Sequence, residues 1–273
     1  MATAKSRKFR LLADPHAAFT LAFVGGAVDA LGWFGLFQIF TGSVTGNVVI
    51  GAASVIPSVT GWAPRLIITA VFVVSAAVGR VAAIAAPGRE TARALPLLLC
   101  GEVVTLAVAW AVGVALSSSM THIDAPAVSI VGALLAFGMG LQNAAVNECL
   151  AGFPATTVVT SSLAKSGAAI ADLAIHSFAR GTDAGVRLRA LAVLVSPIAG
   201  FAAGACSGAV LQYRIGFHSL FLPVAVLLLL VVDSARAIAA TPAPAAAAPA
   251  APPLEVMPVA QEVLLLKEAQ RET

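Results

Sequence analysis

Asp29 is an acidic residue in the middle of a long apolar stretch that runs from Ala17 to Phe40. If this stretch crosses a bilayer, an ionised carboxylate at its centre costs at least about 2.5 kcal/mol, even on lenient insertion scales. The side chain must therefore face other protein groups or carry a proton. This makes Asp29 a candidate for binding a solute or for coupling transport to protons, and a structural bond to another helix is an equal alternative.

A polar, glycine-containing segment follows, from Phe40 to Asn47 (FTGSVTGN). Its composition interrupts a helix and frees backbone N–H and C=O groups. The positive end of a following short helix would then point into a cavity, which suits a small anion or a polar solute. A capped turn between helices is the alternative. The candidate binding or gating residues here are Thr41, Ser43, Thr45 and Asn47.

A second polar set lies in the other half of the chain. Gln142 and Asn143 place adjacent amides in an apolar stretch, and the segment from Thr156 to Thr160 then repeats the Thr-x-x-Val-Thr pattern of Thr41 to Thr45. We expect Gln142, Asn143, Thr156 and Thr160 to contribute to the same site. Amide bonding between helices is an equally good interpretation of the Gln-Asn pair.

Other reactive residue types do not form a convincing catalytic or metal pattern. Ser162 and Lys165 match Ser-x-x-Lys, but the companion motifs of that enzyme class are absent. Glu102 is more simply explained by an ion pair with Arg80 or Arg93. The cysteines and histidines are scattered. We therefore expect no enzyme activity, no catalytic residue, no cofactor and no metal site, and the formal charge of +3 is too small to indicate nucleic acid binding.

The elements that must position these residues are membrane-spanning helices. Hydrophobic residues make up 59% of the chain and charged residues only 11%, against roughly 25% charged in an ordinary soluble domain. The predicted fold is an all-α, polytopic bundle with the lipid bilayer as its partner. The six predicted spans are Ala17 to Phe40, Leu66 to Ala86, Leu95 to Leu116, Ala127 to Val146, Ala190 to Leu211 and Phe217 to Val232.

Two apolar pieces are too short or too polar to be confident spans, namely Val48 to Ile56 and Leu163 to Ile175. We predict that both are broken or re-entrant helices. Residues 1–16 form a basic N-terminus, residues 17–238 the membrane domain, and residues 239–273 a disordered Ala/Pro-rich tail. With six spans, both termini lie in the cytoplasm, because the outside then holds only Arg65 and Arg214.

The two halves of the membrane domain, residues 17–117 and 127–238, share one order of elements. Each contains a polar-bearing helix, a Thr-rich break, a short apolar piece and two more spans. Three crossings in each half place the second copy upside down, which predicts an inverted 3+3 repeat, as in many secondary transporters. Gly200, Gly204 and Gly208 add a small-residue packing seam in the fifth span, which we expect to lie within one chain.

Three motifs together resemble the YoaK-type bacterial membrane proteins, a family of unknown function. They are Gly25 to Ala30 (GGAVDA), Phe40 to Asn47 (FTGSVTGN) and Gly138 to Ala144 (GMGLQNA). The resemblance covers about Ala17 to Ile238, although this chain has Thr160-Ser161 where the family tends to have Thr-Gly. It implies a multi-span protein of the bacterial inner membrane and brings no established substrate.

Two hypotheses for function follow from the sequence. The first is a transporter or permease for a small polar or anionic solute, in which the polar residues of both halves line a central site. The second is a scaffold or accessory subunit that transports nothing, whose polar residues only hold helices together. The sequence does not indicate an oligomeric state.

Overall fold

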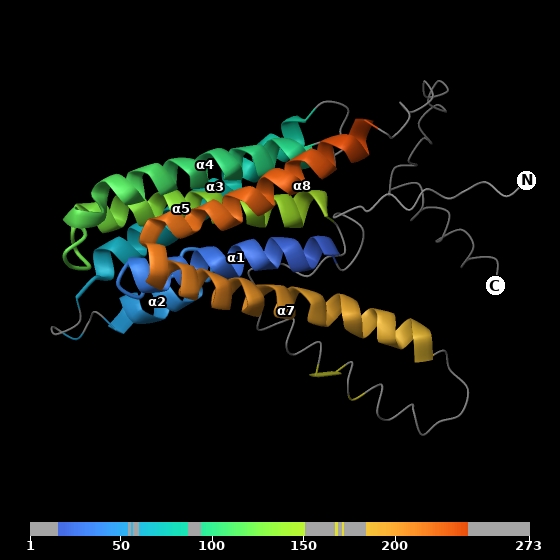
Figure 1. The fold of residues 1–273 in the computed structure, drawn as a ribbon, viewed down its shortest axis with the longest axis horizontal. Coiled ribbons are helices and arrows are strands. Elements are labelled where there is room, and N and C mark those ends of the chain that lie inside the picture. Colours follow the sequence, from blue (N-terminus) through green and yellow to red (C-terminus); the bar gives the residue numbers. More distant parts are fainter. Residues whose placement is uncertain are drawn as a thin grey trace, which may run out of the picture. The chain divides into compact units, whose positions relative to one another are not determined.

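The computed structural model describes residues 16–53, 60–86, 94–150 and 184–239, together with residues 56, 167, 168 and 171. Every regular element in these ranges is a helix, which confirms the predicted all-α membrane bundle (Figure 1). The main elements are α1 (His16–Gly35), α2 (Thr45–Ala52), α3 (Trp62–Ala85), α4 (Leu95–Leu116), α5 (Pro126–Cys149), α7 (Ala184–Ile215) and α8 (Phe221–Ala239), with short 3-10 helices η4 (Ser117–Ser119) and η5 (Gly216–Leu220).

Five candidate membrane spans meet the requirements of length and hydropathy in the described part of the chain. Four of them correspond to α1, α3, α4 and α5, and the fifth runs continuously from Leu194 to Arg236 over α7, η5 and α8. These spans indicate a multi-pass membrane protein, because each is at least as long as the hydrocarbon core requires. The total of six crossings stays a prediction.

The side chains facing outward are those of a protein solvated by lipid. The outer faces of α3 and α4 expose large aliphatic residues, among them Val73, Val81, Leu97 and Val104. In water such exposed apolar faces would cost free energy, whereas in hydrocarbon they are solvated at no cost. The backbone groups beneath them are paired within the helices, as a bilayer requires. By contrast, most residues of α1 and α5 are buried, so these two helices lie at the centre of the bundle.

Close pairs of helices make up the core, and small residues allow their close approach. The most extensive contact joins α1 to α7, and the next joins α3 to α5 (Figure 1). Gly200 faces the backbone of Phe19, Gly204 that of Phe23 and Gly208 that of Ala27, so the predicted glycine seam packs against α1 within the same chain. On the other pair, Gly140 of α5 faces the backbone of α3. Backbone contact of this kind is a standard means of helix association in membranes.

Gly204→Ala is expected to destabilise the protein by about 1–3 kcal/mol, the usual cost of overpacking a filled interface. A Cβ atom at this position would overlap the carbonyl group of Phe23, so α1 and α7 must separate. The matched control is Gly51→Ala in α2, where the added atom meets only the Leu66 side chain at an ordinary 3.7 Å. Thermal unfolding of the purified variants in detergent measures both effects. Equal stability of the two variants would contradict the close packing of this seam.

Candidate functional site

The chain reverses direction directly after α1. The helix was predicted to continue to Phe40, but it ends at Gly35, and the next residues, Phe37 and Gln38, take left-handed conformations with φ of 55° and 63°. The backbone then returns along α1, so that Gly32 faces Ile39 and Thr41. Residues 41–43 lie beside Asp29. Asp29 stands six residues before the end of α1, or about 9 Å along the helix. We call residues 36–44 the re-entrant segment.

Asp29 binds the re-entrant segment through both carboxylate oxygens. Its Oδ1 accepts the backbone N–H of Thr41 (2.9 Å) and of Gly42 (2.6 Å) and, at longer range, the Thr41 hydroxyl (3.4 Å). Its Oδ2 accepts the N–H of Ser43 (2.9 Å) and the Ser43 hydroxyl (2.6 Å). The residue is only 4% exposed. Three consecutive N–H groups aimed at one anion form the kind of concave anion site that irregular backbone provides. The anion held by this site is the protein's own carboxylate.

Asn47 binds the middle of the re-entrant segment. Its side-chain amide accepts the N–H of Phe40 (3.0 Å) and donates to the carbonyl of the same residue (2.6 Å). Asn47 is fully buried, whereas Ser43 is partly exposed and Thr45, the first residue of α2, is exposed. A short helix does follow the break, as predicted, although it spans Thr45–Ala52 and not Val48 to Ile56.

Arg65 satisfies the carbonyl groups that the reversal leaves free. Its guanidinium donates to the carbonyl of Gly61 (3.0 Å) and, at longer range, to those of Phe37 (3.4 Å) and Gln38 (3.5 Å). The residue is 5% exposed. The backbone N–H groups of the re-entrant segment thus bind the carboxylate of Asp29, and the carbonyl groups near its start bind the guanidinium of Arg65. Arg65 was expected only as an outside charge, because it stands one residue before the predicted span Leu66 to Ala86. Its burial in the bundle indicates a specific partner.

Helix α5 forms the back of this site. Met139 packs at Gly42, and Gln142 donates its amide to the carbonyl of Leu21 on α1 (2.8 Å). Gln142 therefore joins α5 to α1 at a level two helical turns before Asp29. Asn143 accepts a hydrogen bond from Asn147 of its own helix. The structure brings Asp29, Thr41, Ser43 and Asn47 together, and it places Gln142 in the adjoining helix contact. Thr156 and Thr160, like the predicted segment Leu163 to Ile175, lie outside the described residues.

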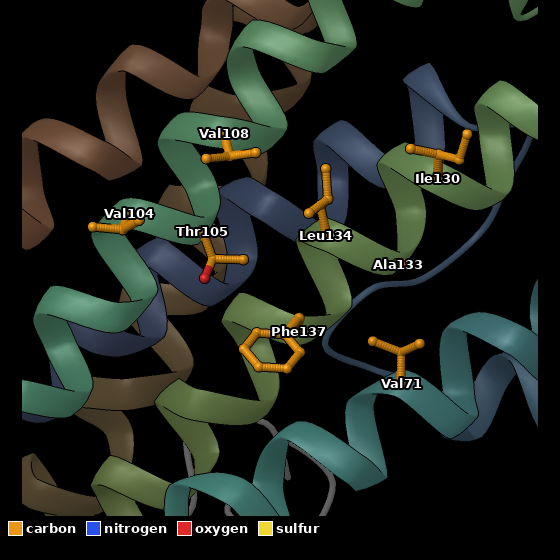
Figure 2. Close-up of a pocket in the computed structure, with 8 residues that line it drawn as sticks. All are labelled: Val71, Val104, Thr105, Val108, Ile130, Ala133, Leu134 and Phe137. Atoms are coloured by element: carbon orange, nitrogen blue, oxygen red, sulfur yellow. The ribbon is translucent and has the colours of Figure 1, made fainter.

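Two of the hollows on the surface of the described helices lie beside α1 and α5. One, of about 390 Å³, lies between α1 and α7, and Asp29 lines it together with apolar and aromatic residues. The other, of about 530 Å³, lies between α3, α4 and α5 (Figure 2). The one polar side chain in this second hollow is Thr105, whose hydroxyl donates to the Gly101 carbonyl at 2.7 Å. The second hollow therefore offers lipid-like surface and no free polar group.

Glu102 does not form the predicted ion pair with Arg80. Arg80 pairs with Glu148 of α5, because α3 packs extensively on α5 and only slightly on α4. Arg93, the other predicted partner, lies outside the described residues. Among the described residues, neither carboxylate oxygen of Glu102 has a hydrogen-bond partner.

Comparison with known proteins gives a family and no further relative. A family model described as "Protein of unknown function (DUF1275)" matches residues 17–232, a range that contains the whole described site. This match confirms the resemblance to the YoaK-type proteins, for which DUF1275 is the family description. No curated protein and no solved structure matches the chain.

Proposed function

The chain belongs to the DUF1275 family of proteins of unknown function, and we propose that it is a permease for a small polar or anionic solute in the bacterial inner membrane, with both termini in the cytoplasm. The observation that carries this proposal is the re-entrant segment held on Asp29. A non-helical segment at membrane depth is tolerated only where protein shelters it or where it lines a water-filled cavity. Here five hydrogen bonds to a single carboxylate hold it in place.

This arrangement suits a gate, because one group controls the whole segment. A solute that offers its own carboxylate or hydroxyl oxygens can compete for the N–H groups of Thr41, Gly42 and Ser43, and Asp29 then releases them. An anion gains most from this exchange, since these N–H groups are already arranged around a negative charge. Of the three residues that donate to Asp29, Ser43 is the accessible one, because it is partly exposed while Thr41 and Gly42 are buried.

The pairing of helices also supports a transporter architecture. The first helix of each predicted half, α1 or α5, packs on the second long helix of the other half, α7 or α3. An inverted repeat produces such an exchange, since a two-fold axis would relate the α1–α7 pair to the α5–α3 pair. A site at the junction of the halves is where transporters of this kind bind their solutes.

Uptake into vesicles tests the proposal directly. The full chain is reconstituted in liposomes and offered a mixture of amino acids, carboxylates, sugars and polyols, and the retained solutes are identified by mass spectrometry. We expect at least one solute to accumulate above protein-free vesicles, and Ser43→Ala to change its rate several-fold while Gly51→Ala leaves it unchanged. Vesicles that retain nothing above the protein-free level would contradict the permease.

The second candidate is a scaffold that transports nothing, and the closure of the site favours it: both oxygens of Asp29 are occupied and Asn47 is paired at both ends of its amide. Thiol labelling separates the two functions. In a chain whose native cysteines, Cys100, Cys149 and Cys206, are replaced by alanine, Ser43→Cys should react with a membrane-impermeant thiol reagent if the segment faces water. A scaffold leaves this cysteine unlabelled, and a transported solute should slow its labelling.

A further inference from the structure

Glu102 is a second acidic residue inside the bundle, and its surroundings differ completely from those of Asp29. It lies on α4 with no exposed surface, and its Cγ is 3.9 Å from the point where a Cβ of Gly138 on α5 would stand. The residues one turn away on the same face, Leu98 and Leu106, are buried apolar side chains. Both carboxyl oxygens lack a hydrogen-bond partner among the described residues.

The ionisable groups on the elements that pack against α4 are engaged elsewhere or distant. On α3, Arg80 pairs with Glu148 and Arg65 binds backbone carbonyls. On η5, His218 accepts a hydrogen bond from Trp110, which lies eight residues beyond Glu102 on α4, or about 12 Å along the helix. On α5, Glu148 and Cys149 lie ten and eleven residues beyond Gly138, or about 15 Å away along the helix. On α8, the side chain of Arg236 is exposed, whereas Glu102 has no exposed surface. In the part of the chain that the structure describes, no cation lies within ion-pair distance of Glu102.

A metal cation does not fit this position either. Hard cations in proteins take several oxygen ligands, whereas the hydroxyl nearest in sequence, that of Thr105, already donates to a backbone carbonyl. The carbonyls of α4 and α5 around this point are engaged in their own helices. A proton is different, because a single carboxyl group binds it without any further ligand and loses its charge in doing so.

We propose that Glu102 is a proton-binding site in the membrane core, which holds its proton in this conformation and exchanges it in another. The site deepens the proposed permease, since its coupling ion would be the proton, and to that extent it rests on the proposed function. It also moves the coupling role from Asp29, the residue that the sequence suggested, to Glu102. Asp29 accepts five hydrogen bonds and so uses its oxygens as acceptors, whereas the oxygens of Glu102 meet no donor among the described residues.

Infrared spectroscopy of the full chain in lipid vesicles tests the proton site without any solute. A protonated carboxyl group has a C=O stretch that is separate from the bands of ionised carboxylates. We expect this band in the wild type at neutral pH, its loss in Glu102→Gln, and its retention in Glu148→Gln, the control on the neighbouring helix. A spectrum of Glu102→Gln that equals that of the wild type would overturn the proposal.

Folding gives an independent result. Glutamine has nearly the shape and the charge of a protonated glutamic acid, so Glu102→Gln should retain the yield and the melting temperature of the wild type. Failure of this variant to fold would also overturn the proposal, because it would show that an ionised carboxylate is required.

Transport measurements keep this inference apart from the proposed function. If uptake is found, an imposed pH gradient should drive it in the wild type and in Glu148→Gln but not in Glu102→Gln. Uptake by a chain that lacks the infrared band would refute the proton site and leave the permease standing. If the chain shows the infrared band but transports nothing, the permease is refuted and the proton site stands.

Discussion

Asp29→Asn is expected to destabilise the protein by about 3–6 kcal/mol, which is the loss of two hydrogen bonds to a charged group at roughly 1.5–3 kcal/mol each. Each oxygen of Asp29 accepts two hydrogen bonds of 2.6–2.9 Å, and Oδ1 also accepts a longer one of 3.4 Å from the Thr41 hydroxyl. An asparagine has one acceptor oxygen, and its NH₂ group can only donate. Whichever way the amide turns, two donors of the re-entrant segment therefore face another donor in a buried site.

Unfolding in detergent, followed by tryptophan fluorescence, measures this loss. Trp33 reports on the site, because its ring centroid lies 4.8 Å from that of Phe40 in the re-entrant segment. Ser43→Ala is the graded control, because it removes only the hydroxyl bond to Oδ2 and should cost about 1.5–3 kcal/mol. Glu102→Gln is the matched control, since it makes the same change from acid to amide inside the bilayer. We expect it to leave the free energy of unfolding almost unchanged. If Asp29→Asn unfolds like the wild type, the carboxylate is not what holds the re-entrant segment.

The sequence predicted the spans well, because the physical requirement behind them is simple. Hydrocarbon demands about 20 apolar residues in a hydrogen-bonded helix, and this requirement is visible in composition alone. It does not determine where a helix ends inside an apolar run. Leu36 and Ile39 are as hydrophobic as the helix before them and are fully buried. Nevertheless they belong to the re-entrant segment, because the left-handed residues Phe37 and Gln38 reverse the chain, and hydropathy carries no signal for that conformation.

The members of the site could be predicted better than their interactions. The spacing of Asp29 and Thr41 to Asn47 pointed to residues that the structure brings together, since Asp29 binds residues 41–43 and Asn47 binds Phe40. Thr45 is the exception, because it is exposed at the start of α2. The freed N–H groups were interpreted as a place for an external anion. A sequence does not show which anion is nearest in space, and here the fold supplies Asp29 itself.

Charged pairs were the least predictable part. Arg80 was expected near Glu102 because the two residues lie toward the same end of neighbouring spans. Chain order, however, does not determine which helices pack. Since α3 packs on α5 far more than on α4, Arg80 meets Glu148 instead. Arg65 was missed for a related reason, because the third helix begins at Trp62, four residues earlier than the predicted Leu66, and so takes Arg65 into the bundle.

Arg65→Met is expected to destabilise the protein by about 2–4 kcal/mol. The methionine fills much of the same space, but it removes the charged hydrogen bond to Gly61 and the longer contacts to Phe37 and Gln38. One hydrogen bond to a charged group contributes about 1.5–3 kcal/mol, and leaving buried carbonyls unpaired adds to the loss. Arg65→Lys should recover only part of it, because an ammonium group cannot contact carbonyls on both sides as the planar guanidinium does.

The matched control is Arg80→Met in the same helix. The side chain of Arg80 is 62% exposed and pairs with Glu148 at the end of the bundle, so this change should cost less than about 1 kcal/mol, as exposed ion pairs do.

A double-mutant cycle that combines Arg65→Met with Ser43→Ala adds a further test of the same segment. Because Ser43 and Arg65 hold the re-entrant segment at different points, their losses should be less than additive, since the first change already loosens what the second one holds. Strict additivity would mean that Asp29 and Arg65 stabilise separate parts of the chain, and that no single element connects them as a gate requires.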